Sequence, residues 1–109
     1  MPEYYTPTIQ ESFAEYEQKQ THVADVRNQI VAKQKLAYNA IYNASECGGL
    51  ECAAFMSTHR DLQDEIADLI ADELESVEEL EDCKRKLYVA LETRKATNRA
   101  AAKMAMITA

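Results

Sequence analysis

The side chains best suited to metal chemistry lie near the middle of the 109-residue chain, at Cys47, Cys52 and His59. A structural zinc site needs four ligands, and its cysteines are commonly two to four residues apart. Here the cysteines follow a Cys-x4-Cys spacing, and the third cysteine, Cys83, lies about 45–50 Å further along a helix. We therefore predict no metal site, with Cys47 and Cys52 as small residues that pack at a turn. A reversible disulfide between them is the alternative.

No residue pattern typical of an enzyme is present. A carboxylate-bridged metal centre in a helical bundle uses Glu-x-x-His pairs, but Lys19 and Met56 stand three residues before His22 and His59. The chain also has no Gly-x-Ser-x-Gly nucleophile motif and no glycine-rich phosphate loop. We therefore expect a protein that is not an enzyme, with no catalytic residue, no cofactor and no small-molecule substrate.

Charged runs suggest three further kinds of site. Acids between Asp61 and Asp68 suit Mg²⁺ by type, but apolar residues among them are expected to be buried, which leaves the acids on a solvated face. The run from Asp72 to Asp82 has seven acids in eleven residues, a pattern that fits either a solvated helical face or a mimic of nucleic-acid phosphates. The basic segment from Lys84 to Lys103 has few aromatic neighbours for base stacking, so we expect no direct nucleic-acid binding.

The elements that carry these residues are indicated by the few helix breakers. Gly48 and Gly49 are adjacent near the centre, and Pro2 and Pro7 stand at the N-terminal end. The composition is 47% hydrophobic and 28% charged, which is too apolar for a disordered chain. A chain interrupted once at its centre indicates two long helices joined by a turn. We predict an all-α, coiled-coil-like antiparallel two-helix hairpin that forms one domain over residues 1–109.

The first helix is predicted at about residues 7–46. Thr6 is a suitable cap, Pro7 suits the first helical position, and Thr8 and Glu11 have the spacing of a capping box. A stripe with steps of three and four residues, or multiples of them, comprises Ile9, Phe13, Tyr16, Val23, Ile30, Ile41 and Ala44, with Gln20, Arg27, Gln34 and Ala37 at the intervening positions. This face is expected to pack against the second helix.

The turn is predicted at about residues 47–57, where Gly48 is expected to adopt the left-handed conformation that closes a helix. The second helix is predicted at about residues 58–106, although residues 50–56 are alternatively already helical. An inner track on this helix comprises Leu62, Ile66, Leu69, Leu80, Cys83, Leu87 and Ala90. A neighbouring outer track comprises Ile70, Leu74, Val77, Tyr88 and Leu91. Two tracks make a face broader than a two-stranded seam, so we expect the outer track to contact a partner helix that completes a bundle.

The order of charges supports antiparallel pairing. Residues 1–82 carry five basic and eighteen acidic side chains, whereas residues 83–109 carry seven basic and one acidic. If the turn centres near residues 48–51, facing residues have numbers that add up to about 97–102. Glu3, Glu11, Glu15 and Glu17 are then opposite the basic segment, and Arg27, Lys33 and Lys35 are opposite acids between Asp64 and Glu78. Exposed pairs of this kind select register and orientation and add little stability.

The sequence also allows predictions about where in the cell the protein is located. No stretch reaches the roughly 18 consecutive apolar residues that a membrane-spanning helix needs. The N-terminal residues lack the basic region of a secretory signal peptide, and three cysteines suit a reducing compartment. We therefore expect no membrane span and a cytoplasmic protein, with export by a route that needs no leader as the alternative.

Two short motifs carry a resemblance to a known family. Cys47-Gly48-Gly49 stands at the expected turn, and Tyr88 and Glu92 form a Tyr-x-x-x-Glu motif. In this layout the chain resembles the small secreted Trp-x-Gly helical-hairpin proteins, which are leaderless, acidic and dimeric. The resemblance implies an export signal at Tyr88 and Glu92. This sequence departs from the family in having no Trp and in a second helix that continues well past Tyr88.

Together these patterns predict a structural, assembly or adaptor protein that acts through helix–helix contacts, as a homo-oligomer or a subunit of a larger complex. The expected partner is a second copy or another helical protein. A leaderless secreted hairpin and an acidic inhibitor that mimics nucleic acid are the alternatives.

Overall fold

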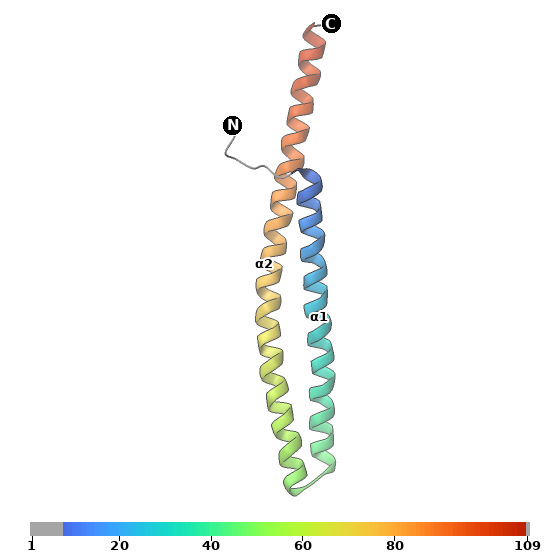
Figure 1. Cartoon of the computed structure of the whole chain (residues 1–109), viewed down its shortest axis with the longest axis vertical. Helices are drawn as coiled ribbons and strands as arrows, with labels where there is room; N and C mark the ends of the chain where they lie inside the picture. The colour runs from blue at the N-terminus through green and yellow to red at the C-terminus, as the bar shows by residue number, and fades with distance from the viewer. Residues whose placement is uncertain (1–7, 109) are drawn as a thin grey trace. The chain divides into compact units, whose positions relative to one another are not determined.

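The computed structural model of the protein describes residues 8–108, which form two α-helices. Helix α1 spans Ile9–Glu46 and has 38 residues, and helix α2 spans Gly49–Thr108 and has 60 residues (Figure 1). The part of the chain described contains no strand. The chain divides into two compact units: unit 1 combines Met1–Gln20 with Glu78–Ala109, and unit 2 comprises Thr21–Val77.

The start of α1 is set by a side-chain cap. The Thr8 hydroxyl accepts a hydrogen bond from the Glu11 backbone N–H at 3.1 Å, as the capping-box spacing predicted. The Thr8 carbonyl also accepts the backbone N–H of Ser12 at 3.0 Å. Because Thr8 is the cap, the helix begins at Ile9 and not near residue 7. The predicted roles of Thr6 and Pro7 lie outside the described residues.

The turn is much shorter than predicted, because α1 ends at Glu46 and α2 already begins at Gly49. The last turn of α1 tightens, with the Cys47 backbone N–H donating to the Ala44 carbonyl at 3.4 Å. Gly49, with φ +60°, is the glycine in the left-handed conformation, so the expectation for Gly48 was wrong by one residue. Residues 50–56 are helical, which was the alternative start for the second helix.

Within unit 2, α1 and α2 pack through a small apolar cluster. Its members are Val26, Ile30, Ala37 and Ile66, with Leu62 and Leu69 packed against them. Two salt bridges flank the cluster, Arg27 to Glu73 at 2.9 Å and Lys33 to Glu65 at 3.1 Å. Salt bridges between these parts of the helices had been predicted, because Arg27 and Lys33 were expected opposite the acids between Asp64 and Glu78. Residue numbers rise on α1 as they fall on α2, so the pairing is antiparallel.

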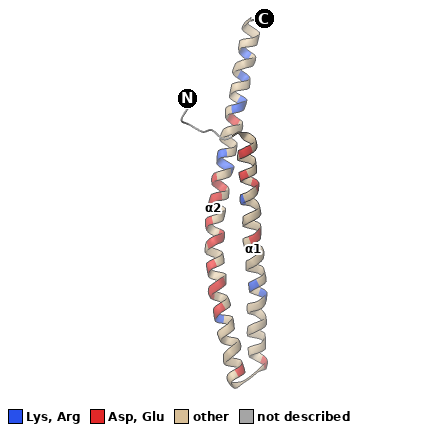
Figure 2. Ribbon diagram, in the orientation of Figure 1, with Lys and Arg blue, Asp and Glu red and all other residues tan. Residues whose placement is uncertain are grey.

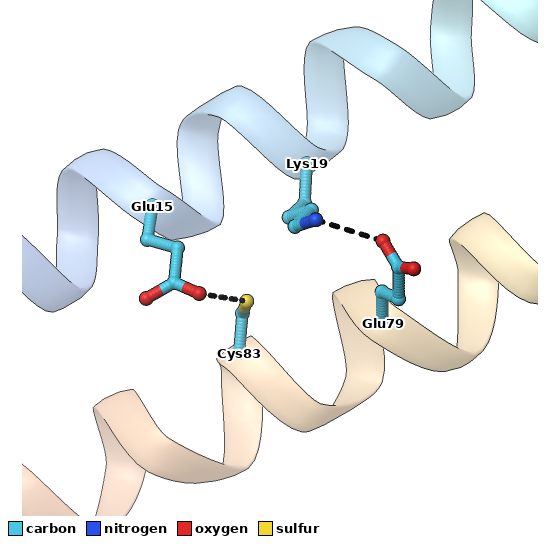
Figure 3. A network of polar contacts seen from close by, with 4 residues as sticks. All are labelled: Glu15, Lys19, Glu79 and Cys83. Carbon is cyan, nitrogen blue, oxygen red and sulfur yellow. Dashed lines mark hydrogen bonds and ion pairs between the residues drawn. The ribbon is translucent and has the colours of Figure 1, made fainter.

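Within unit 1, the contact between the helices is more polar. Cys83 and Leu87 are the buried apolar residues of this unit, and Ser12 is buried on α1. Lys19 Nζ lies 2.7 Å from Glu79 Oε2, and Cys83 Sγ donates a hydrogen bond to Glu15 Oε1 at 3.4 Å (Figure 3). Both pairs have residue numbers that add up to 98, within the predicted 97–102 range. The all-α antiparallel hairpin is therefore confirmed.

Two contacts bear on the expected match between first-helix acids and the basic segment. Glu15 bonds to the Cys83 thiol, and Arg85 pairs with Asp82 on its own helix at 2.9 Å. Glu3 lies outside the described residues. Glu15 therefore lies opposite the residue that directly precedes the basic segment, which agrees with the predicted orientation.

The face of α1 that packs against α2, called the seam below, was predicted correctly at every second position. At the positions between, the packed residue is the one directly before the predicted residue. The buried and half-buried residues are Ile9, Ser12, Tyr16, Lys19, Val23, Val26, Ile30, Lys33, Ala37, Ala40, Ala44 and Cys47. They follow strict steps of three and four, which is the heptad spacing of a coiled coil. Phe13 and Ile41, which had been expected in this seam, are 49% and 36% exposed. Small residues such as Ser12 and Ala40 take the seam positions because they let the two helix backbones approach closely, while bulkier side chains flank the contact.

On α2 the inner track coincides with the seam. Ile66, Cys83 and Leu87 are buried, and the remaining members are half-buried. Glu73 and Ser76 occupy the seam positions between Leu69 and Leu80, where the sequence offered no apolar residue. Beyond Ala90, every described residue of α2 through Thr108 is exposed.

Candidate interaction surface

The cysteines and the histidine near the turn were the side chains best suited to bind a metal ion. Cys47, Cys52 and His59 are half-buried seam residues. His59 Nε2 lies 3.3 Å from the Gln63 side-chain nitrogen. Across residues 8–108 no group of three or more His, Cys, Asp or Glu side chains is arranged to hold a metal ion. All three cysteines are free thiols in this structure.

Two of the thiols are held in their neutral form. Burial raises the pKa of the Cys83 thiol above its ordinary 9.0, and the hydrogen bond to Glu15 raises it further. Burial and the neighbouring Glu51 likewise raise the pKa of Cys47. The reactive form of cysteine is the thiolate, so both residues are poor nucleophiles at neutral pH. Their environment is that of packing residues.

The residues predicted to meet a partner are left largely uncovered by their own chain. In unit 2, Leu74 is 63% exposed, Ile70 is exposed and Val77 is half-buried. In unit 1, Tyr88 is 57% exposed and Leu91 is also exposed. All five lie on α2 and project beside its seam rather than into it. Apolar side chains at regular helical spacing that stay in water are typical of a surface that another helix covers.

In unit 1 an apolar groove runs beside this surface. It is lined by Ile9, Gln10, Phe13, Ala14 and Glu17 of α1 and by Leu87 and Leu91 of α2. Phe13 therefore contributes an aromatic side chain to a groove that is also lined by Leu91, a residue of the outer track. The sequence could not place Phe13 there, because it was assigned to the seam. A second groove in unit 1 combines the charged side chains of Asp82, Arg85 and Lys86 with apolar ones such as Ile9 and Val89.

Helix α1 also presents apolar side chains that the prediction of a partner surface did not include. In unit 2, Val31, Tyr38 and Tyr42 are exposed, and the first two line a shallow depression with Gln34, Lys35 and Asn39. Their spacing of seven and four residues puts them on one side of the helix. A search for a second apolar stripe on the first helix, like the one made on the second, would have found them.

Charge changes sign along α2. Figure 2 shows acids along the part of α2 before Cys83 and a run of bases directly after it. Within the acidic run Asp72–Asp82, Glu73 and Glu79 are bound by Arg27 and Lys19. In the basic segment, Lys84 Nζ lies 6.0 Å from the centre of the Tyr88 ring, a cation–π distance. In the sequence, Leu74 and Val77 of unit 2 therefore lie within the acidic run, and Tyr88 and Leu91 of unit 1 lie within the basic segment.

The chain matches no protein-family model, and no curated protein or solved structure matches it either. The resemblance to the Trp-x-Gly proteins therefore rests on the turn residues and on Tyr88 and Glu92 alone. No helix within residues 8–108 has an apolar stretch that would cross a bilayer.

Proposed function

We propose that this protein is a non-enzymatic assembly protein that acts through contact between its α2 helix and another helix. The observation that carries the proposal is the outer track, in which Ile70, Leu74, Tyr88 and Leu91 stay exposed and Val77 is half-buried, although the residues of the neighbouring inner track are buried or half-buried. A two-helix hairpin buries only one narrow strip of each helix, which leaves a broad α2 face available.

The composition of the surface supports a helical partner. Ile70, Leu74 and Val77 follow one another at steps of four and three residues, and Tyr88 and Leu91 are three residues apart, which is the spacing of residues that share one side of a helix. Leucine, isoleucine and tyrosine at these positions offer flat apolar area, and charged residues border them on α2. A small-molecule ligand would instead need a concave pocket with a few convergent polar groups.

Site-specific photocrosslinking tests the proposal. A photoreactive amino acid at position 74 should give a crosslink to a helical protein, either a second copy or a different chain, in cells that express the protein. The matched control carries the same residue at position 68, where Asp68 is exposed on another side of α2. Crosslinking at position 74 no stronger than at position 68 would refute the proposed surface.

The acidic-inhibitor alternative receives less support from the structure. Three of the seven acids between Asp72 and Asp82 already pair with cations of their own chain, namely Glu73, Glu79 and Asp82. A mimic of nucleic acid depends on carboxylates that are not neutralised. That alternative predicts binding to a nucleic-acid-binding protein that weakens steeply with salt, whereas contact through the outer track predicts weak dependence on salt.

A further inference from the structure

We infer that the partner of the outer track is a second copy of this chain, bound antiparallel so that α2 packs on α2 about a two-fold axis between residues 82 and 83. The inference rests on the proposed function, because it names the occupant of the surface described there. In a two-fold interface, residue i of one copy contacts residue j of the other and the reverse contact is made as well. The outer track must therefore be complementary to itself.

One antiparallel register meets this condition for four of the five track residues, and leaves Ile70, at the end of the track, opposite Lys95. When facing residues have numbers that add up to 165, Leu74 of one copy is opposite Leu91 of the other. Val77 is then opposite Tyr88, so both central apolar contacts join two apolar side chains. Each contact pairs a unit 2 residue of one copy with a unit 1 residue of the other.

The charged positions of the same face agree with this register. The track continues between Val77 and Tyr88 through Glu81 and Lys84, at steps of four, three and four residues. Their numbers also add up to 165, so each Glu81 faces Lys84 of the other copy across the axis. At the edge of the contact, exposed Glu78 is brought near Arg85 of the other copy. Opposite charges therefore face each other at each of these positions.

Other arrangements lose this agreement. Sliding one helix by a heptad in one direction puts Leu74 opposite Lys84 and Val77 opposite Glu81. Sliding it in the other direction puts Val77 opposite Lys95. A parallel pairing in register puts Glu81 against Glu81 and Lys84 against Lys84, which repel each other. Register selection by charges and by unpaired apolar groups is common in helical assemblies, since each wrong pairing carries a cost.

The groove of unit 1 supplies a place for the most exposed residue of the track. Leu91 lines this groove with Leu87 and Phe13, and the proposed register brings Leu74 of the second copy to Leu91. Leu74 is 63% exposed in its own chain, and the groove offers it apolar neighbours from both helices. Phe13, displaced from the intrachain seam, becomes part of the contact between copies.

A charge-swap experiment tests both the partner and the register. The solution mass of the chain, its Glu81→Lys variant and its Lys84→Glu variant is measured by light scattering across a concentration series. The unchanged chain should be a dimer. Each single variant puts two like charges across the axis at both contacts, so its dimer dissociation constant should rise at least ten-fold.

Mixing the two single variants should restore a dimer, because the lysine introduced at position 81 of one variant then faces the glutamate introduced at position 84 of the other. The double variant Glu81→Lys/Lys84→Glu should dimerise like the unchanged chain. Glu81 is exposed and Lys84 is half-buried in the single chain, so circular dichroism should show unchanged helix content in every variant.

The possible failures have different meanings. An unchanged chain that stays monomeric at all concentrations overturns the second copy as occupant, while a crosslink from position 74 to a different protein keeps the proposed function. A dimer that neither single variant weakens, or that mixing does not restore, overturns the antiparallel register. Absence of both the dimer and the crosslink overturns the proposed function as well.

Discussion

Replacement of Ile66 by alanine is the sharpest test of the seam. Ile66 is 5% exposed and belongs to the apolar cluster of unit 2. The change removes three carbon atoms, which at about 0.8 kcal/mol for each buried carbon gives roughly 2.4 kcal/mol, and the cavity left behind adds to this. We expect a loss of about 3 kcal/mol in the free energy of unfolding, a large fraction of the roughly 5–15 kcal/mol typical of folded proteins.

The matched control is Ile70→Ala, one helical turn away on the same helix. Ile70 is 42% exposed, so the same deletion should cost about 1 kcal/mol or less. Both losses are measured by urea unfolding followed by circular dichroism at 222 nm, at a protein concentration low enough for the monomer. If the two variants lose the same stability, the division of α2 into a covered and an uncovered face is incorrect.

Two further predictions concern pH and export. The pKa values of Cys83 and of Cys47 in the folded protein are raised above the 9.0 of the unfolded chain. Above about pH 9 the folded protein therefore binds more protons than the unfolded chain. The contribution of the two thiols to the free energy of unfolding should be constant below about pH 9 and should be lost as the pH rises through the folded pKa values. The urea midpoint measured from pH 7 to pH 10 should show this fall, and replacing both cysteines by alanine should remove it; an equal fall without the thiols would contradict the assignment. Replacement of Tyr88 and Glu92 should abolish secretion only if the resemblance to the Trp-x-Gly proteins extends to export, which an assay of culture supernatant decides.

The main features of the fold could be predicted from residue types. The two adjacent glycines and the absence of breakers elsewhere in the body of the chain imply two helices and a central turn, because an uninterrupted run of helix-compatible residues has no other place to reverse. The inner track of α2 was also predicted, since its residues recur at steps of three and four in two stretches, from Leu62 to Leu69 and from Leu80 to Ala90. The absence of a metal site at the cysteines, inferred from their spacing, stays a prediction.

The candidate surface was predicted in part. The outer track was identified as a second stripe, and the structure leaves its members exposed or half-buried, but what covers them stays a prediction. Phe13 was missed as a groove residue, because an aromatic residue at helical spacing normally indicates a buried position. The exposed stripe at Val31, Tyr38 and Tyr42 was missed because only one apolar face was sought on the first helix.

The sequence by itself determined that the chain forms two long helices, that they reverse at a central turn beside Gly48 and Gly49, and that their charges favour antiparallel pairing, although it made the turn too long. Only the tertiary structure decided which stripe of α1 faces α2. The predicted and the observed stripes of α1 share every seventh residue from Ile9 to Ala44. Between these shared residues, each member of the observed stripe stands one position before the corresponding member of the predicted stripe. The larger apolar residues Phe13 and Ile41 favoured the predicted stripe. The observed stripe instead places Val26 in the apolar cluster and lets Lys19 and Lys33 pair with Glu79 and Glu65 of α2. That choice depends on side chains distant in sequence, so no pattern within the first helix contains it.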